Sequence, residues 1–300
     1  MAQRAERCAA DDGVRQMDGH LVAHGPREFG GDHRSWSDQV RHFSRAYRCV
    51  TISARGYPPS DVPADDDAYG QDIANRDVVA VLDAAGIGRA HVVGLSMGAY
   101  TALQLALHFP GRVNAVIAAG AGSGALKATR AGFIAEALAT AAQMERALRI
   151  GAEQMGGGPT RVQLQNKDPL GWAEMVARIA EHPPAGSARV LRNVQARRPS
   201  LYDLDAALAA VEAPVLLIVG DEDEPCLDVN LHMKRIMPTA QLAVLPGSGH
   251  VVNYEEPALF AQLVERFLAA VDRGSWRPRD ARAAPTASGT AAVTVNGEAG

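Results

Sequence analysis

Val-Val-Gly-Leu-Ser-Met-Gly, residues 92–98, is the stretch that decides the fold. Its last five residues, Gly94 to Gly98, match the pattern Gly-x-Ser-x-Gly, in which a strand turns directly into a helix. Because Gly94 and Gly98 lack Cβ atoms, strand and helix can approach closely, while Ser96 is forced into a strained backbone conformation. We expect the Ser96 hydroxyl at the carboxyl end of the strand. The next helix would begin at Met97, whose free N–H and helix dipole favour negative charge there.

The sequence on either side of this turn alternates between short apolar runs and amphipathic runs, which makes an idle serine in a Gly-rich turn the weaker alternative. Expected strands are 49–52, 91–93, 113–119, 215–219 and 241–245, and expected helices include 72–85, 97–108 and 257–271. Strands that alternate with helices form a parallel sheet with helices on both faces. The chain therefore belongs to the α/β fold class.

Four regions differ in pattern. Residues 1–27 form a divergent N-terminal segment, in which only 21–23 read as a strand, so that the N-terminal strands are expected to be atypical. Residues 28–122 and 210–272 carry the α/β alternation. Residues 123–209 are Ala-rich and helical, which indicates an inserted helical lid. Residues 273–300 lack periodicity, and we expect a disordered tail.

Composition excludes several classes of protein. The net charge is 30 − 34 = −4, which rules out broad attraction to nucleic acid or to an anionic membrane. The three cysteines show no metal-binding spacing, so that no metal site is expected. No apolar run approaches the roughly 18 residues of a membrane span, and no signal peptide is visible. The expectation is a cytoplasmic protein with a small-molecule substrate, whose oligomeric state the sequence leaves open.

A serine nucleophile needs a base, and the base needs an orienting carboxylate. The apolar strand 215–219 runs into Gly-Asp-Glu-Asp, and we choose Asp223 over Asp221 and Glu222, which can be solvated loop acids. The last strand runs into Pro-Gly-Ser-Gly-His, so that His250 reaches the same edge of the sheet. The order Ser96, Asp223, His250 completes a candidate triad.

The other histidines lack this context. Those on expected helices, His42, His108, His182 and His232, are expected at the surface, whereas His91 opens a strand and is expected to pack.

These motifs resemble the α/β-hydrolase family, and specifically its lid-bearing esterase, lactonase and haloperoxidase-like group. The resemblance runs from about residue 30 to 270 and rests on four segments, SARGYPPSD (53–61), GLSMG (94–98), PVLLIVGDED (214–223) and PGSGH (246–250). It implies an eight-stranded, mostly parallel sheet and no cofactor. It also implies that Ser96 is the nucleophile, His250 the general base and Asp223 its partner.

The oxyanion hole departs from the family pattern. His24-Gly25 fits the usual motif, but the next residue, Pro26, has no N–H to donate. A second register, Arg27 to Asp32, places Phe29 at the donor position, unless this segment is an ordinary Gly-rich connection. We expect the backbone N–H groups of Met97 and Phe29 to form the oxyanion hole.

The predicted activity is cleavage of a small carboxylic ester or lactone through an acyl-enzyme intermediate. Apolar residues of the lid, Phe133, Trp172 and Met175, could line an acyl pocket or pack within the lid itself. The alternatives are a non-catalytic ligand-binding relative, and a perhydrolase or C–C bond hydrolase with the same triad.

Overall fold

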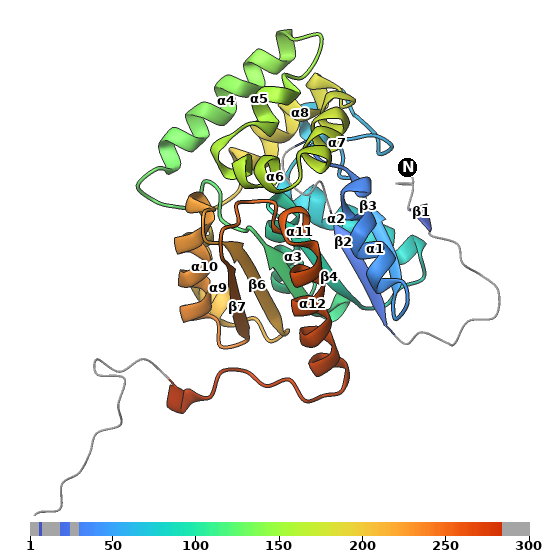
Figure 1. Ribbon diagram of the computed structural model, residues 1–300, viewed down its shortest axis with the longest axis vertical. Helices are drawn as coiled ribbons and strands as arrows, with labels where there is room; N and C mark the ends of the chain where they lie inside the picture. Colours follow the sequence, from blue (N-terminus) through green and yellow to red (C-terminus); the bar gives the residue numbers. More distant parts are fainter. Residues whose placement is uncertain (1–5, 8–18, 25–29, 284–300) are drawn as a thin grey trace, which may run out of the picture.

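A computed structural model describes residues 6–7, 19–24 and 30–283 of this chain. Its centre is a seven-stranded sheet in the order β1-β3-β2-β4-β5-β6-β7 (Figure 1). The strands are β1 (Glu6–Arg7), β2 (His20–His24), β3 (Arg48–Ile52), β4 (Ala90–Leu95), β5 (Val113–Ala119), β6 (Val215–Gly220) and β7 (Ala240–Leu245). Strands β2 to β7 run parallel, and β1 pairs antiparallel with β3. The α/β class and the mostly parallel sheet are therefore confirmed.

The N-terminal part of the sheet departs from the sequence expectation in its number of strands. Within the described residues the sheet has seven strands rather than the eight that the resemblance implies, and β1 is only two residues long. Strand β2 contains the expected strand 21–23, and it occupies the interior of the sheet between β3 and β4. Five residues of modest hydrophobicity suffice there because Leu21 and Val22 are buried on opposite faces.

Helices cover both faces of the sheet. One face packs Leu21, Val93 and Ile117 against α1 (Ser37–Phe43) and α12 (Pro257–Asp272). The other face packs against α2 (Gln71–Ala84), α3 (Met97–His108), α9 (Asp205–Ala209) and α10 (Glu224–Ile236). A short helix, α11 (Val252–Glu255), precedes α12. Short 3₁₀ turns lie at His33–Trp36, Asp66–Ala68, Pro110–Arg112, Pro159–Arg161, Leu201–Leu204 and Ala281–Ala283.

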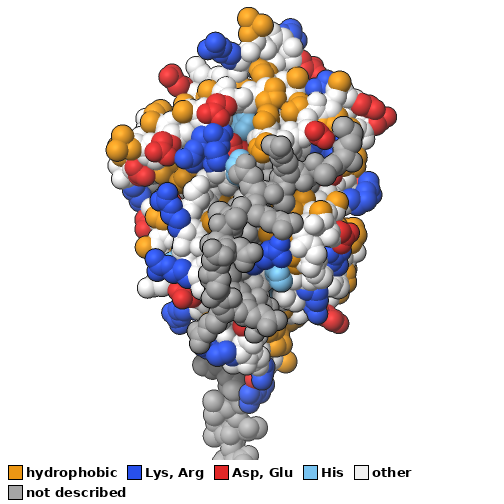
Figure 2. All heavy atoms as spheres, turned by 90° about the vertical axis from the view of Figure 1, so that its right-hand side faces the viewer, with side chains coloured by type: hydrophobic (Ala, Val, Ile, Leu, Met, Phe, Trp, Pro, Cys, Tyr) orange, Lys and Arg blue, Asp and Glu red, His pale blue; other side chains and the backbone are white. Residues whose placement is uncertain are grey.

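A separate set of helices lies above the sheet in Figure 1. We call residues 130–195 the helical layer; it comprises α4 (Arg130–Arg146), α5 (Ala152–Gly156), α6 (Val162–Lys167), α7 (Pro169–Ala180), α8 (Pro184–Val190) and a π-helical turn (Leu191–Gln195). Four of the six exposed large hydrophobic residues among the described ones belong to it: Leu138, Leu148, Val162 and Leu170. Figure 2 shows one face of the molecule, on which acidic and basic side chains are intermixed.

The start of the expected disordered tail is ordered against the core. Trp276 packs against the cluster beneath α12, and the N–H of Arg279 donates to the carbonyl of Pro238. Residues 284–300 lie outside the described residues. None of the described helices is long and apolar enough to cross a membrane.

Candidate active site

Ser96 lies at the turn between β4 and α3 and has a strained backbone. Its φ is 55° and its ψ is −111°, and it is the one non-glycine residue with positive φ among those the structure describes. A Cβ on Gly94 would lie 2.1 Å from the carbonyl carbon of Gly98, so that only glycine fits at that position. The Ser96 N–H donates to the carbonyl of Ala119 at 2.8 Å, which fixes the turn to the end of β5. Such strain persists only where the surrounding structure holds it.

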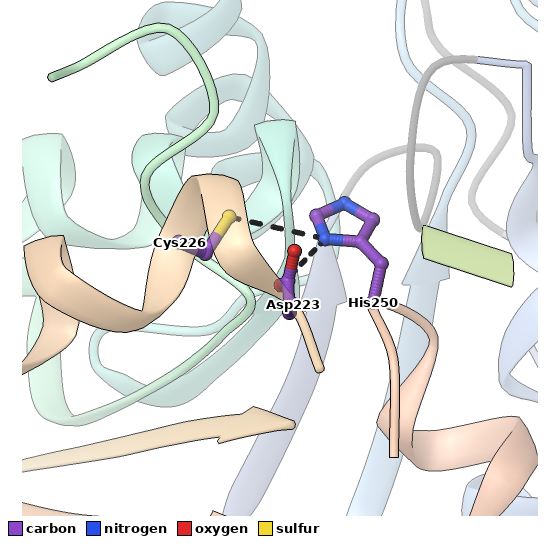
Figure 3. A group of neighbouring side chains, drawn as sticks. All are labelled: Asp223, Cys226 and His250. Carbon is purple, nitrogen blue, oxygen red and sulfur yellow. Dashed lines mark hydrogen bonds and ion pairs between the residues drawn. The ribbon is translucent and has the colours of Figure 1, made fainter. Parts of the chain in front are cut away.

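Asp223 and His250 form a buried pair at the same edge of the sheet (Figure 3). Asp223 follows β6 and precedes α10, while His250 lies in the loop after β7. His250 Nδ1 is 2.8 Å from Asp223 Oδ2, and the two residues are 5% and 0% exposed. The two other candidate carboxylates point elsewhere, since Asp221 accepts from the Ser248 N–H and Glu222 from the Gln163 side chain. The structure therefore pairs His250 with the carboxylate that the sequence analysis chose.

The imidazole of His250 lies against the end of β5, next to the serine turn. A Cβ on Gly120 would be 3.2 Å from Nδ1 and Cε1 of His250, and Gly120 directly follows the residue that binds the Ser96 N–H. Within the described residues Ser96 and His250 share no hydrogen bond. Hydrogen bonds between nucleophile and base are often long before substrate binds.

The Asp223 carboxylate controls the charge of the imidazole. Burial alone would lower the pKa of His250, but the charge of Asp223 and the hydrogen bond to it raise this pKa well above its ordinary value. Because Nδ1 faces the carboxylate, Nδ1 carries the proton and Nε2 remains as the basic atom. The pair thus fixes both the tautomer and the basicity of His250.

Cys226 is a neighbour of this pair that the sequence analysis missed. Its Sγ lies 3.9 Å from His250 Nδ1 and 3.3 Å from the Gly120 carbonyl oxygen (Figure 3). Asp223, Cys226 and His250 offer three possible metal-ligand atoms within 4.8 Å of one another. Burial raises the pKa of the thiol, however, and a neutral thiol is a poor ligand. Cys226 follows Asp223 by three residues, on the first turn of α10, and this spacing is a sequence signal for their proximity. A buried cysteine is commonplace, however, so that the signal is easily overlooked.

The loop that carries His250 is held on both sides. The His250 N–H donates to the carbonyl of Thr160 in the helical layer at 2.8 Å. The buried carboxylate of Glu255 accepts from the N–H groups of Gly249, at 2.6 Å, and Val251, at 3.2 Å. Both residues flank the histidine, so that one side chain fixes the backbone before and after it. Sequence reasoning missed Glu255 because an acid near a helix start looks like a solvated residue.

The structure describes only one of the two candidate oxyanion donors, Met97. Met97 is the first residue of α3 and is 7% exposed, and the N–H at such a position has no partner within its own helix. Phe29 lies outside the described residues, which resume at Gly30 with a φ of 96°.

The two candidate pocket residues lie on α7. Trp172 is half-buried in the packing of the helical layer, and its Nε1 donates to the Gly156 carbonyl. Met175 is 5% exposed and lines a small cavity together with Gly30, Gly31 and Tyr254. Met175 therefore lies close to the segment that follows the expected donor loop, whereas Trp172 packs.

His182 was expected at the surface, and this expectation is wrong. The side chain is 3% exposed and packs edge-on against Tyr57, and its Nε2 lies 3.6 Å from Asp32 Oδ2. The buried Asp32 also pairs with Arg34, which in turn binds Glu181. A polar residue just after α7 looks solvent-exposed in sequence, but here the helical layer folds it onto the core. His91 packs as expected and binds Asp272.

Comparisons with known proteins identify the family to which this fold belongs. The model of the "Alpha/beta hydrolase family" matches residues 21–263. The chain is 30% identical over 250 residues to 2-hydroxy-6-oxo-6-phenylhexa-2,4-dienoate hydrolase of Burkholderia cepacia, covering 78% of this chain and 82% of that one. It is 28% identical over 243 residues to 3-oxoadipate enol-lactonase 1 of Acinetobacter baylyi, covering 81% and 86%. The crystal structure of a hydrolase from Pseudomonas aeruginosa superposes with a TM-score of 0.74 at 26% identity, covering 89% and 98%.

Proposed function

The chain belongs to the alpha/beta hydrolase family, and we propose that it is a serine hydrolase that cleaves a small carboxylic ester or lactone. The observation that carries this proposal is the strained Ser96 at the edge of the sheet that also holds the buried Asp223–His250 pair. A strained serine and a buried ion pair both cost stability, so that their coincidence at one edge favours a catalytic role.

In the proposed reaction Ser96 Oγ attacks the carbonyl carbon of the substrate while His250 Nε2 takes the hydroxyl proton. Asp223 holds the imidazole in the required tautomer and stabilises the imidazolium that forms. His250 then protonates the leaving oxygen, and the acyl group remains on Ser96. Water, deprotonated by His250, attacks this ester and releases the acid.

The negative oxygen of the tetrahedral intermediate would be stabilised by the Met97 N–H at the start of α3. A second donor from the loop before Gly30, for which Phe29 is the candidate, completes the proposed oxyanion hole. Each such donor contributes on the order of 3 kcal/mol to lowering the barrier. The positive end of the α3 dipole adds to this field.

The helical layer would act as the lid and determine which substrates enter. Met175 is the proposed pocket residue, because it lines a cavity next to Gly30. One relative is named as a lactonase and another as a hydrolase of a dienoate. The second name makes cleavage of a carbon–carbon bond by the same triad the second candidate function.

A fluorophosphonate probe, which reacts with activated serines, tests the proposal directly. We expect one adduct by intact mass on the wild type and none on Ser96→Ala. Turnover of short esters and lactones should fall by about 10⁵-fold or more in that variant, as when a triad serine is removed elsewhere. Circular dichroism should show that the variant is folded.

The outcomes separate the alternatives. A folded wild-type protein that takes up no probe would contradict the proposal and favour a non-catalytic binding protein. Labelling of Ser96 without ester or lactone turnover would direct the search to carbon–carbon bond substrates or to perhydrolysis.

A further inference from the structure

A second groove lies away from the serine turn, where the start of α2, the end of α3 and the chain after the π-helical turn meet. Its volume is about 570 Å³, and its lining includes Tyr69, Gly70, Gln104, Phe109 and Arg198. Sites for small molecules commonly have volumes of roughly 300–1,000 Å³. Neither Ser96 nor Asp223 nor His250 lines this groove. Gln104 is eight residues along α3 from Ser96, which corresponds to about 12 Å along the helix axis.

Arg198 is a buried cation that has no anionic partner among the described residues. It is 6% exposed, and within the described part of the chain no carboxylate lies within ion-pair distance of it. Its Nη2 donates to the Ser123 carbonyl at 2.9 Å and its guanidinium lies 4.6 Å from the centre of the Tyr100 ring, whereas Nη1 has no hydrogen-bond partner there. Burial lowers its pKa to about 10, although Tyr100 and Cys226 act in the opposite direction. Buried charges are normally paired.

Two further features near Arg198 also favour an anion. The Arg130 side chain binds the carbonyl oxygens of Gly124 and Arg198, which places a second positive charge behind the groove. Helix α2, fourteen residues long, begins at the rim, and its N-cap residue Gly70 offers no side chain to its first N–H groups. The helix dipole is therefore positive at this point. The acid at this rim, Asp72, is exposed and bonded to Arg76.

The remaining lining indicates the rest of the ligand. Gln104 is 4% exposed, and its Nε2 has no hydrogen-bond partner among the described residues, so that this donor lacks an acceptor there. Tyr69 and Phe109 supply apolar walls. A planar guanidinium fork matches a carboxylate, and aromatic walls match an apolar body.

We propose that this groove binds a small organic carboxylate with an apolar body, whose carboxylate is recognised by Arg198 and Gln104. The binding is independent of the proposed hydrolysis, because it uses none of the three candidate catalytic residues.

Calorimetric titration of the full chain with benzoate tests the proposal, with benzyl alcohol as the uncharged ligand of similar size. We expect benzoate to bind and benzyl alcohol to bind at least about tenfold more weakly, since hydrogen bonds to charged groups are the stronger kind. Arg198→Met should weaken benzoate binding at least about tenfold, and Gln104→Leu should weaken it too. Arg197→Met removes an exposed arginine of the same groove and should change affinity less than about threefold.

Three results would overturn the proposal. Absence of benzoate binding to the wild type would contradict recognition of a carboxylate in this groove. Unchanged affinity in Arg198→Met, or equal binding of benzyl alcohol, would exclude recognition by the guanidinium. Loss of binding in His250→Ala would place benzoate at the candidate active site instead. If Arg198→Met does not fold, Arg198→Lys keeps the charge without the planar fork, and it should weaken benzoate binding while retaining the fold.

Discussion

The edge of the sheet and the helical layer above it hold their side chains by different means. At the edge, Ser96, Asp223 and His250 each follow a parallel strand, and continuous backbone pairing of β4, β5, β6 and β7 fixes their positions. The helical layer shares an apolar cluster with the core, and separate polar contacts also attach it. These contacts include Thr160 to the His250 loop, Lys167 to Glu256 and Glu181 to Arg34. The edge is therefore set by the topology of the fold, whereas the fit of the layer depends on individual side chains.

Asp223→Asn tests the edge and has the largest expected effect. The variant removes the charge that raises the pKa of His250 and disturbs the tautomer, so that kcat should fall by about 10⁴-fold. Activity requires neutral His250 and is lost as the pH falls through its pKa. Without the carboxylate this pKa is lower, and the acid limb of kcat/KM against pH should move to lower pH. An unmoved acid limb would contradict the role of Asp223.

Glu255→Gln tests how the loop that carries His250 is held, and its expected effect on kcat is intermediate. The amide group can accept from the N–H of Gly249 or of Val251 but turns a donor toward the other, which leaves that buried N–H unpaired. Such a loss costs about 1–3 kcal/mol, so that kcat should fall roughly tenfold to a hundredfold with little change in KM.

Glu256→Gln is the matched control for that variant. Glu256 is the next residue, but it is partly exposed and bonded to Lys167. Loss of a pair of this kind costs about 1 kcal/mol or less, and activity should change less than about fivefold. Equal effects of the two variants would show that Glu255 does not hold the His250 loop in place.

The pH dependence of stability tests whether His182 helps to attach the helical layer to the core. Its expected effect is the smallest. Burial lowers the pKa of His182, and the neighbouring Asp32 only partly opposes this. The unfolded chain then binds more protons than the folded one below about pH 6.5, so that stability contributed by neutral His182 is lost as the pH falls. His182→Gln should reduce this loss in urea unfolding measured between about pH 7 and pH 5.

His91 is a second buried histidine, in strand β4 of the core, and burial lowers its pKa as it does that of His182. The two histidines can therefore be compared by where acid opens the structure. Hydrogen exchange should locate the acid-induced opening of the wild type in the helical layer. Opening that begins around β4, or an unchanged pH dependence in His182→Gln, would contradict the assignment to His182.

The contrast between edge and layer also explains what the sequence could predict. The apolar runs before Ser96, Asp223 and His250 identify strands, and parallel strands bring their carboxyl ends together, so that the candidate site follows from local pattern and topology. The burial of His182 and the clamp formed by Glu255 depend on contacts between segments far apart in the chain, on which local periodicity carries no information. Strand β2 was underestimated for a related reason, because neighbours on both sides stabilise it more than its own composition does.

The hydrogen bond from the His250 N–H to the Thr160 carbonyl has a consequence for protein engineering. An exchange of the helical layer between homologous enzymes would keep the strands and the candidate triad. Here the donated segment would have to supply a carbonyl oxygen at the place of residue 160. A chimaera without it would retain every residue of the candidate triad and still leave the backbone N–H of His250 without its acceptor. Exchange of the region should therefore begin after that residue, at α6, or carry the 3₁₀ turn Pro159–Arg161 along with it.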